Sequence, residues 1–261
     1  RSRGLGDVYK RQLDINRIVI LITAFMTIAF IATGIFSREK NPLPDFTIYK
    51  DVKEKKDAFF SYILPLVEEQ NNVIKKQREK LLELKNLSIP ELSRAQEKFV
   101  KGLARQYRVD TKELTKDNVK TLLHRVDLVP ASLALAQAAM ESAWGTSRFA
   151  VQANNLFGQW CYTKGCGLVP LRRNTGSSHE VEKFLSVSDA ISSYMRNINT
   201  HRAYRELRDD RASLRKAGEP VAGHELAEGL IDYSELREAY VHEIQAVIRI
   251  NKLAQYDVPA Q

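Results

Sequence analysis

The chain is 261 residues long, with 44% hydrophobic and 28% charged residues. This composition suits one catalytic domain plus an accessory region, and it excludes a mini-protein, a collagen-like repeat, a largely disordered chain and a multi-span membrane protein. The 40 Lys and Arg residues outnumber the 32 Asp and Glu residues, which gives a net charge of +8, and half of this excess lies in residues 1–40.

The N-terminal part contains an apolar run at residues 18–36 (IVILITAFMTIAFIATGIF), which is long enough to cross a bilayer as a helix. Arg11 and Arg17 precede it and no small-x-small cleavage site follows, so residues 13–40 are predicted to be a retained signal anchor, with a cleaved signal peptide as the alternative. The rest of the chain would then lie in the periplasm or cell envelope, tethered to the inner membrane. Residues 1–12 resemble sequencing-adaptor read-through and are interpreted as a non-native leader.

Residues 41–122 are predicted to be a linker followed by accessory helices. The stretch 51–87 is rich in Lys and Glu and places apolar residues at helical spacing. Pro65 is expected to kink or break this helix, and two further helices are expected at 90–107 and 111–124. The apolar heptads are not sustained, so these helices are expected to pack on the next domain and not to form a free coiled coil.

A candidate catalytic carboxyl lies at the end of an apolar helix. Residues 130–145 (PASLALAQAAMESAWG) open with proline and contain no ionisable group before Glu141, which is typical of a buried helix. Gln137 lies one turn earlier on the same face, and Trp144 follows three residues later. Burial would raise the pKa of the Glu141 carboxyl, and a carboxyl protonated near neutral pH can act as a general acid toward a leaving-group oxygen. The alternative is an acidic residue that reaches solvent where the helix ends.

The sequence around this carboxyl resembles a known family. Residues 141–150 (ESAWGTSRFA) and 154–158 (NNLFG) are similar to the glucosaminidase family of peptidoglycan hydrolases, glycoside hydrolase family 73. The similarity continues in 184–207 and 233–253, and it is strongest for the bacterial Bax-type branch. Upstream helices also belong to that branch, so the resemblance covers most of residues 51–256.

This resemblance implies a fold and an activity. Residues 123–261 are expected to form a mostly helical α+β domain of the lysozyme-like class with a small β lobe. The domain would cut the β-1,4 bond after N-acetylglucosamine in peptidoglycan, as an autolysin does, with Glu141 as the general acid. A lytic transglycosylase remains an alternative, although residues 155–160 (NLFGQW) differ from the Gly-Leu-Met-Gln stretch of those enzymes. A further alternative is a wall-binding scaffold without activity.

A second carboxylate is expected across the scissile bond, at about 6.5–9.5 Å in an inverting enzyme. The short alternation in residues 179–185 predicts a strand that places Glu180 and Glu182 on one face. Glu180 is preferred by a narrow margin over Glu182. A solvated strand face is the alternative for both residues. The substrate's own acetamido group could also replace a second carboxylate.

Tyrosines and other aromatic residues are candidates for the glycan site. Tyr233 and Tyr240 are seven residues apart and share a helix face, and the family resemblance places at least one such tyrosine beside the catalytic glutamate. Tyr240 is preferred for the site, whereas Tyr233 has core packing as its alternative. Aromatic rings also stack on the apolar C–H faces of sugars, although Trp144 is equally compatible with the core. The predicted substrate-binding residues are Gln137, Trp144, Asn155, Phe157, Trp160 and Tyr233.

Cys161 and Cys166 are the only cysteines, and an exported domain favours a disulfide between them. Two cysteines cannot complete a tetrahedral zinc site, and the His-Glu pairs at 224–225 and 242–243 lack the second His of a zinc protease motif. Neither a metal ion nor a cofactor is predicted. Arginines at 202–215 alternate with acidic residues, so the predicted partners are peptidoglycan strands and the membrane, and not nucleic acid. The sequence does not predict the oligomeric state.

Overall fold

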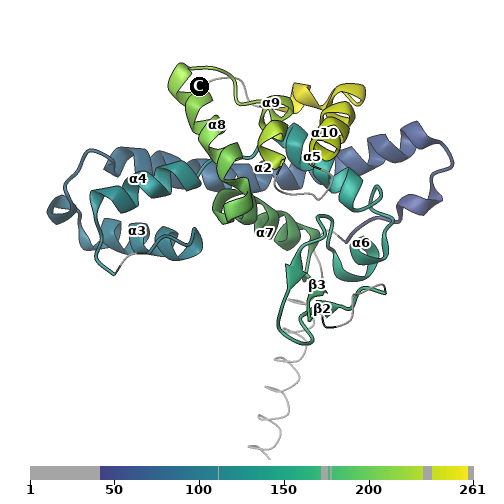
Figure 1. The fold of residues 1–261 in the computed structure, drawn as a ribbon, viewed down its shortest axis with the longest axis horizontal. Helices are drawn as coiled ribbons and strands as arrows, with labels where there is room; N and C mark the ends of the chain where they lie inside the picture. The colour runs from purple at the N-terminus through teal and green to yellow at the C-terminus, as the bar shows by residue number, and fades with distance from the viewer. Residues whose placement is uncertain (1–41, 111, 172–175, 177, 232–236, 258–261) are drawn as a thin grey trace, which may run out of the picture. The chain divides into compact units, whose positions relative to one another are not determined.

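The structure is a computed structural model, and it describes residues 42–110, 112–171, 176, 178–231 and 237–257 (Figure 1). The described residues all belong to one compact unit, residues 42–261. The predicted leader at 1–12, the apolar run at 18–36 and Tyr233 lie outside the described residues. Within the described part of the chain, no helix is both long enough and apolar enough to cross a membrane.

The accessory region is dominated by α2 (Val52–Leu84), a helix of 33 residues. The Asp51 carboxylate accepts a hydrogen bond from the Glu54 N–H and caps the helix start. Pro65 lies inside α2, so of the two predicted effects the break is wrong, and the kink stays a prediction. Proline removes one backbone hydrogen bond, at a cost of about 3 kcal/mol, but burial of each large apolar side chain stabilises the helix by about 1.5–3 kcal/mol. The residues on this buried stripe are Phe59, Phe60, Ile63, Leu66, Val67, Ile74, Leu81 and Leu84.

Two shorter helices complete this region and confirm the predicted helices at 90–107 and 111–124. They are α3 (Arg94–Gln106) and α4 (Lys116–Arg125). Each begins with a capping box, in which a Ser or Thr side chain and an amide side chain three residues later satisfy the first backbone N–H groups. Short 3₁₀ turns η1 (Phe46–Ile48) and η2 (Ile89–Glu91) precede α2 and α3 respectively.

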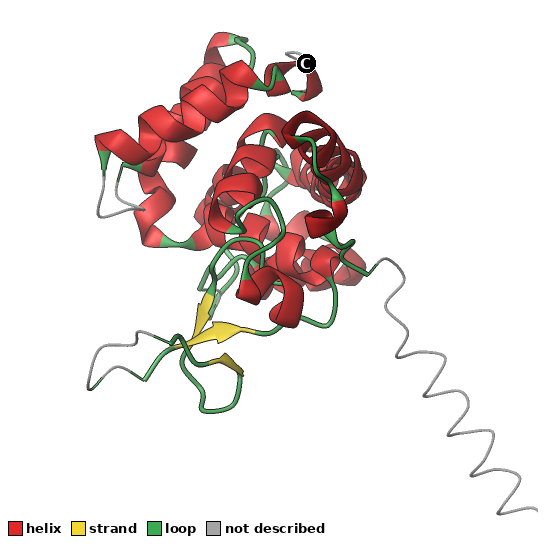
Figure 2. Cartoon of the chain, turned by 90° about the vertical axis from the view of Figure 1, so that its right-hand side faces the viewer, coloured by secondary structure: helices red, strands yellow, loops and turns green. Residues whose placement is uncertain are grey.

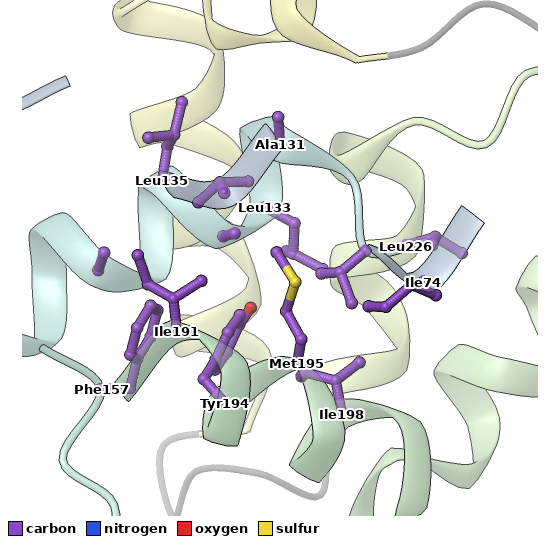
Figure 3. Packing of buried hydrophobic residues seen from close by; sticks show 14 of the residues in the cluster. Ile74, Ala131, Leu133, Leu135, Phe157, Ile191, Tyr194, Met195, Ile198 and Leu226 are labelled. Atoms are coloured by element: carbon purple, nitrogen blue, oxygen red, sulfur yellow. The ribbon is translucent and has the colours of Figure 1, made fainter. Parts of the chain in front are cut away.

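The central helix of the molecule is α5 (Ala131–Glu141), which is buried from Ala131 to Ala139. A helix that is buried on all its faces needs partners on every side, and α5 contacts α2, α9, α10 and η5. Figure 3 shows side chains of α2, α5, α7 and α9 meeting in this core, among them Ile74, Leu133, Met195 and Leu226. The surrounding elements are α6 (Arg148–Ala153), α7 (Val187–Thr200), η3 (Arg202–Tyr204), α8 (Arg205–Ala217), α9 (Gly223–Leu226), η4 (Ala227–Leu230), α10 (Glu238–Ile250) and η5 (Leu253–Tyr256).

The described strands form a small β lobe beside the helices (Figure 2). They are β1 (Trp160–Cys161), β2 (Gly167–Leu168) and β3 (Glu180–Glu182), paired antiparallel in the order β1-β3-β2. Gly167 pairs with Glu182 in the register. A Cβ on Gly167 would clash with the Val181 carbonyl. The mostly helical α+β class with a small β lobe is therefore confirmed, and it is the architecture expected of a lysozyme-like glucosaminidase domain.

A buried ionic cluster connects the accessory helix to the helices around α5. The Asp127 carboxylate accepts two hydrogen bonds from Arg215, at 2.6 and 2.7 Å, and lies 3.4 Å from Arg78 of α2 and 3.7 Å from Arg211. Burial would raise the pKa of Asp127, but the three arginines outweigh it and hold this pKa below its ordinary value. Because this cluster and the α2–α5 packing cross residue 123, the boundary between 41–122 and 123–261 stays a prediction.

Candidate active site

The end of α5 positions Glu141. Ser142 follows it, and its hydroxyl donates to the Ala138 carbonyl at 2.6 Å and accepts from the Gly145 N–H at 2.8 Å. These bonds satisfy backbone groups at the end of the helix, so the helix stops with the half-buried Glu141 as its last residue. The serine of the Glu-Ser-x-Trp-Gly motif is therefore explained by the helix end that it stabilises.

The next residues turn the chain sharply. Ala143, Trp144 and Gly145 all have positive φ angles, of 51°, 60° and 75°. Gly145 is required for a second reason, because a Cβ there would lie 2.5 Å from a ring carbon of Phe46. The turn therefore fixes both the end of α5 and the direction in which Trp144 leaves it.

Trp144 packs against the accessory helix α2. Its ring makes edge-to-face contacts with Phe59 and Phe60, at centroid distances of 5.8 and 5.3 Å. The Lys56 ammonium lies 4.8 Å from the same ring. This arrangement favours the core alternative for Trp144 over the predicted contact with substrate.

A chain of hydrogen bonds leads from the core to Glu141. The Tyr240 hydroxyl donates to Oε1 of Glu141 at 2.9 Å, and Nε2 of Gln137 donates to the Tyr240 hydroxyl at 3.0 Å. The Tyr194 hydroxyl donates to Oε1 of Gln137 at 2.6 Å. Tyr240 thus contacts the carboxyl as predicted, but Gln137 is only 1% exposed and lies behind Tyr240, which disfavours its predicted contact with substrate.

Burial raises the pKa of Glu141 above its ordinary value, and the hydrogen bond from Tyr240 offsets part of this rise. The 154–158 loop lies against the same carboxyl, because a Cβ on Gly158 would be 3.8 Å from Oε2 of Glu141. Gly158 has a φ of +63°, a conformation that favours glycine. The carboxyl therefore has a tyrosine hydroxyl at Oε1 and a bare stretch of backbone near Oε2.

Asn155 holds this loop to the β lobe. Its Oδ1 accepts from the N–H groups of Phe157 and Gln159, and its Nδ2 donates to the carbonyls of Gln159 and Glu182. The side chain is 1% exposed. These four bonds engage both ends of the amide, so the geometry favours a structural role for Asn155 over the predicted contact with substrate.

Phe157 is also an internal residue. Its ring stacks on Tyr194 with centroids 3.9 Å apart and an interplanar angle of 9°, and the two rings lie side by side in Figure 3. Phe157 is 2% exposed. This stacking holds the ring of Tyr194, whose hydroxyl donates to Gln137. It disfavours a glycan contact for Phe157.

The two candidate second carboxylates lie in different environments. Glu180 is 6% exposed, and its oxygens accept hydrogen bonds from the N–H groups of Gly165 and Gly167 at 3.0 and 2.9 Å. Glu182 is half-buried; burial raises its pKa above the ordinary value, and Arg196 of α7 partly offsets this rise. The geometry therefore favours Glu182 over the predicted Glu180, whose carboxylate is bound to backbone amides, and the choice of second carboxylate stays a prediction.

The disulfide predicted between Cys161 and Cys166 is present, with Cα atoms 6.2 Å apart. It closes the loop that carries the Gly165 N–H bound by Glu180. Cys161, Cys166 and Glu180 come close enough together to resemble a metal site. However, the two sulfur atoms are bonded to each other and the carboxylate is bound to backbone amides, so this donor set is engaged in holding the loop.

Among the predicted substrate-binding aromatic residues that the structure describes, Trp160 is the one that is largely open to solvent. It is 56% exposed, and its ring stacks on His179 with centroids 4.1 Å apart at 16°. A flat, supported aromatic surface suits the C–H face of a sugar ring. Sequence reasoning missed His179, and it also missed Tyr194, which is one of several apolar-face residues of α7 and has no distinguishing sequence signal.

Comparison with known proteins identifies the class to which this fold and site belong. Residues 116–253 match the Glucosaminidase family, described as mannosyl-glycoprotein endo-β-N-acetylglucosaminidase. The chain belongs to this glucosaminidase family, as its sequence motifs predicted.

The chain is also similar to individual known proteins. The chain is 34% identical over 217 residues to Protein bax of Escherichia coli (strain K12), which covers 83% of this chain and 77% of that protein. The resemblance to the Bax-type branch is therefore confirmed. Among solved structures, the catalytic domain of the autolysin Auto from Listeria monocytogenes matches at 18% identity with a TM-score of 0.37, covering 67% of this chain and 93% of that chain.

Proposed function

We propose that this protein is a peptidoglycan glycosidase that hydrolyses the β-1,4 bond between N-acetylglucosamine and N-acetylmuramic acid, with Glu141 as the general acid. The observation that carries the proposal is the half-buried Glu141 carboxyl at the end of α5, whose pKa is raised by burial. Membership of the glucosaminidase family supports the reaction class. A cell-wall substrate implies an envelope location for residues 42–261, and tethering by residues 18–36 remains part of the proposal.

In the proposed reaction, Glu141 donates its proton to the glycosidic oxygen as the bond from this oxygen to the anomeric carbon breaks. Positive charge develops on the anomeric carbon and the ring oxygen. Water then adds to the anomeric carbon and gives up one proton. The Tyr240 hydroxyl stabilises the Glu141 carboxylate that remains, because hydrogen bonds to charged acceptors are stronger than those to neutral acceptors.

We propose Glu182 as the second carboxylate, which takes the proton from water. Its half-buried position on β3 and its raised pKa support a base that is shielded from bulk solvent. Glu180 supports the lobe from behind through its bonds to the Gly165 and Gly167 amides. In a substrate-assisted reaction the acetamido group would replace Glu182, so the Glu182→Gln variant would keep activity within a few fold of the unaltered protein.

The test measures soluble glycan released from purified peptidoglycan by residues 42–261, compared with the Glu141→Gln variant. General acids contribute roughly 10²- to 10⁴-fold, so this variant is expected to lose at least about a hundredfold in rate. Glu243→Gln is the matched control, since it makes the same chemical change at an exposed position of α10. Equal rates in Glu141→Gln and the control would contradict the proposal.

A further inference from the structure

The hydrogen-bond chain behind Glu141 has a direction that the chemistry of one amide determines. Oε1 of an amide side chain only accepts hydrogen bonds, and Nε2 only donates them. Tyr194 lies 2.6 Å from Oε1 of Gln137, so the Tyr194 hydroxyl must be the donor. Nε2 of Gln137 then faces Tyr240 at 3.0 Å, and Tyr240 must accept from it.

This arrangement directs the proton of Tyr240. Its hydroxyl oxygen accepts from Gln137, which leaves the single O–H hydrogen for Oε1 of Glu141 at 2.9 Å. Gln137, Tyr194 and Tyr240 are 1%, 3% and 5% exposed, so bulk water does not compete for these bonds. An oxygen that accepts from Tyr240 has one fewer lone pair available and is the poorer position for an acidic proton.

We propose that Tyr194 and Gln137 are positioning residues that fix the direction of this chain, so that Glu141 accepts at Oε1 and carries its catalytic proton on Oε2. The proposal rests on the proposed role of Glu141 as general acid. Oε2 is the oxygen near Gly158, where the backbone offers no side chain. The glycosidic oxygen is therefore protonated from the Gly158 side of the carboxyl.

Other ionisable groups around Glu141 lie on several elements. Glu141 is the only ionisable residue on α5, and the hydrogen bond from Tyr240 lowers its pKa. The ionisable groups on other elements of this region include Lys56 on α2, Glu182 on β3, Arg196 on α7, His224 and Glu225 on α9, and Glu238, His242 and Glu243 on α10. The variants below leave all of these groups in place.

The experiment is a ¹³C NMR titration of the Glu141 carboxyl in the full chain, with the resonance assigned by its loss in Glu141→Gln. Tyr194→Phe keeps the ring that stacks on Phe157 but removes the hydroxyl. The Gln137 amide can then turn, Tyr240 can donate to its oxygen, and Glu141 loses a donor. The pKa of Glu141 is expected to rise by about one unit, the size of one hydrogen bond to a charged group.

Tyr240→Phe is expected to give the same rise, and the double variant Tyr194→Phe/Tyr240→Phe should equal Tyr240→Phe alone, because both changes act through one bond. Gln137→Met fills the same space without hydrogen bonds. The Tyr240 oxygen, which then no longer accepts from Gln137, can accept from the protonated Glu141 carboxyl, and this favours the neutral form and should also raise the pKa. Tyr107→Phe is the matched control, since its buried hydroxyl donates to Oε1 of Gln77 at 2.8 Å elsewhere in the molecule.

A Glu141 titration in Tyr194→Phe and Gln137→Met that matches the unaltered protein would overturn the proposal, as would additive shifts in the double variant. The titration reads Glu141 whether or not the protein cleaves glycan. If the pKa of Glu141 shifts as predicted but the protein cleaves no glycan, the proposed function is overturned. The proposed direction of the hydrogen bonds from Tyr194 to Glu141 is then still supported. If the protein is active, the alkaline limb of the pH–rate profile of each variant should move to higher pH, as the pKa of Glu141 does.

Discussion

Glu141 combines a buried position with an ionisable group, and this combination reduces stability as the pH rises. Its pKa in the folded state lies above the ordinary value of 4.5 because burial disfavours the carboxylate. The unfolded chain therefore releases this proton first, and folding stability falls between pH 4.5 and the folded-state pKa. Below that range the carboxyl is neutral in both states.

Glu141→Gln is accordingly expected to be more stable than the unaltered protein at pH 8 but equal to it at pH 4. The gain should be about 1.4 kcal/mol for each unit by which burial raises the pKa. Urea unfolding at the two pH values measures the difference, and the contributions of other groups cancel in the comparison. A gain that is the same at both pH values would show that Glu141 is not desolvated.

Trp160 carries a second prediction at the scale of the residue. Removing its exposed ring in Trp160→Ala should weaken glycan binding by about three- to tenfold, which corresponds to an aromatic contact of about 0.5–1.5 kcal/mol. The loss should raise KM and leave kcat nearly unchanged, and Trp160→Phe should restore part of it. A fall in kcat with an unchanged KM would contradict a stacking role.

Sequence reasoning placed Glu141 by its position at a helix end and Tyr240 by the family resemblance, and their catalytic roles stay predictions. Their contact across 99 residues of chain bears out the predicted proximity. The same reasoning assigned Gln137 and Asn155 to substrate, since a sequence shows that a residue is polar but not which backbone or side-chain groups bind it. Tyr194 was missed because its hydroxyl lies on an otherwise apolar helix face.

At the scale of the element, the β lobe depends on Glu180. Glu180→Gln leaves one acceptor oxygen for two backbone N–H groups, so one charged hydrogen bond is lost and stability should fall by about 1.5–3 kcal/mol. The midpoint of urea unfolding measures this loss, with Glu243→Gln as the control. Hydrogen exchange at the Gly165 and Gly167 amides should also accelerate. Slow exchange at both amides together with a hundredfold loss of activity would instead favour Glu180 as the catalytic base.

The elements themselves were largely predictable because helix periodicity and capping residues are local signals. The helix through Pro65 was not, since its continuation depends on tertiary burial of the apolar stripe on both sides of the proline. The strand register of the β lobe could not be predicted from the sequence either. It depends on Gly167 facing Glu182, on the hydrogen bond that Glu180 accepts from the Gly167 N–H, and on the one that Asn155 donates to the Glu182 carbonyl.

For the whole molecule, the Asp127 cluster joins α2 to the helices that surround α5. Asp127→Asn leaves three buried or half-buried arginines without their carboxylate, and the expected cost is about 3–5 kcal/mol in unfolding free energy. Asp209→Asn is the control, because Asp209 is exposed and its contact with His124 is an ion pair only when the histidine is protonated. A cost of less than 1 kcal/mol, as for a typical surface pair, would show that this cluster does not hold the two regions together.

The cluster also bears on the predicted domain boundary. A division at residue 122 follows naturally from composition and from the position of the family motif. The contacts of α2 with α5 and the Asp127 cluster cross this boundary within the compact unit of residues 42–261, and the division stays a prediction. Long-range packing of this kind leaves no local signal in the sequence.

The most direct test of the proposed activity identifies the chain ends that cleavage produces. Residues 42–261 and Glu141→Gln are incubated with purified peptidoglycan, and the products are reduced with borohydride and analysed by mass spectrometry. Reduced N-acetylglucosamine ends, present with the unaltered protein and lost in the variant, are the expected result. Anhydro-muramyl or reduced muramic ends would contradict the proposed bond specificity. Absence of products while the protein still sediments with the wall would contradict the proposed activity itself.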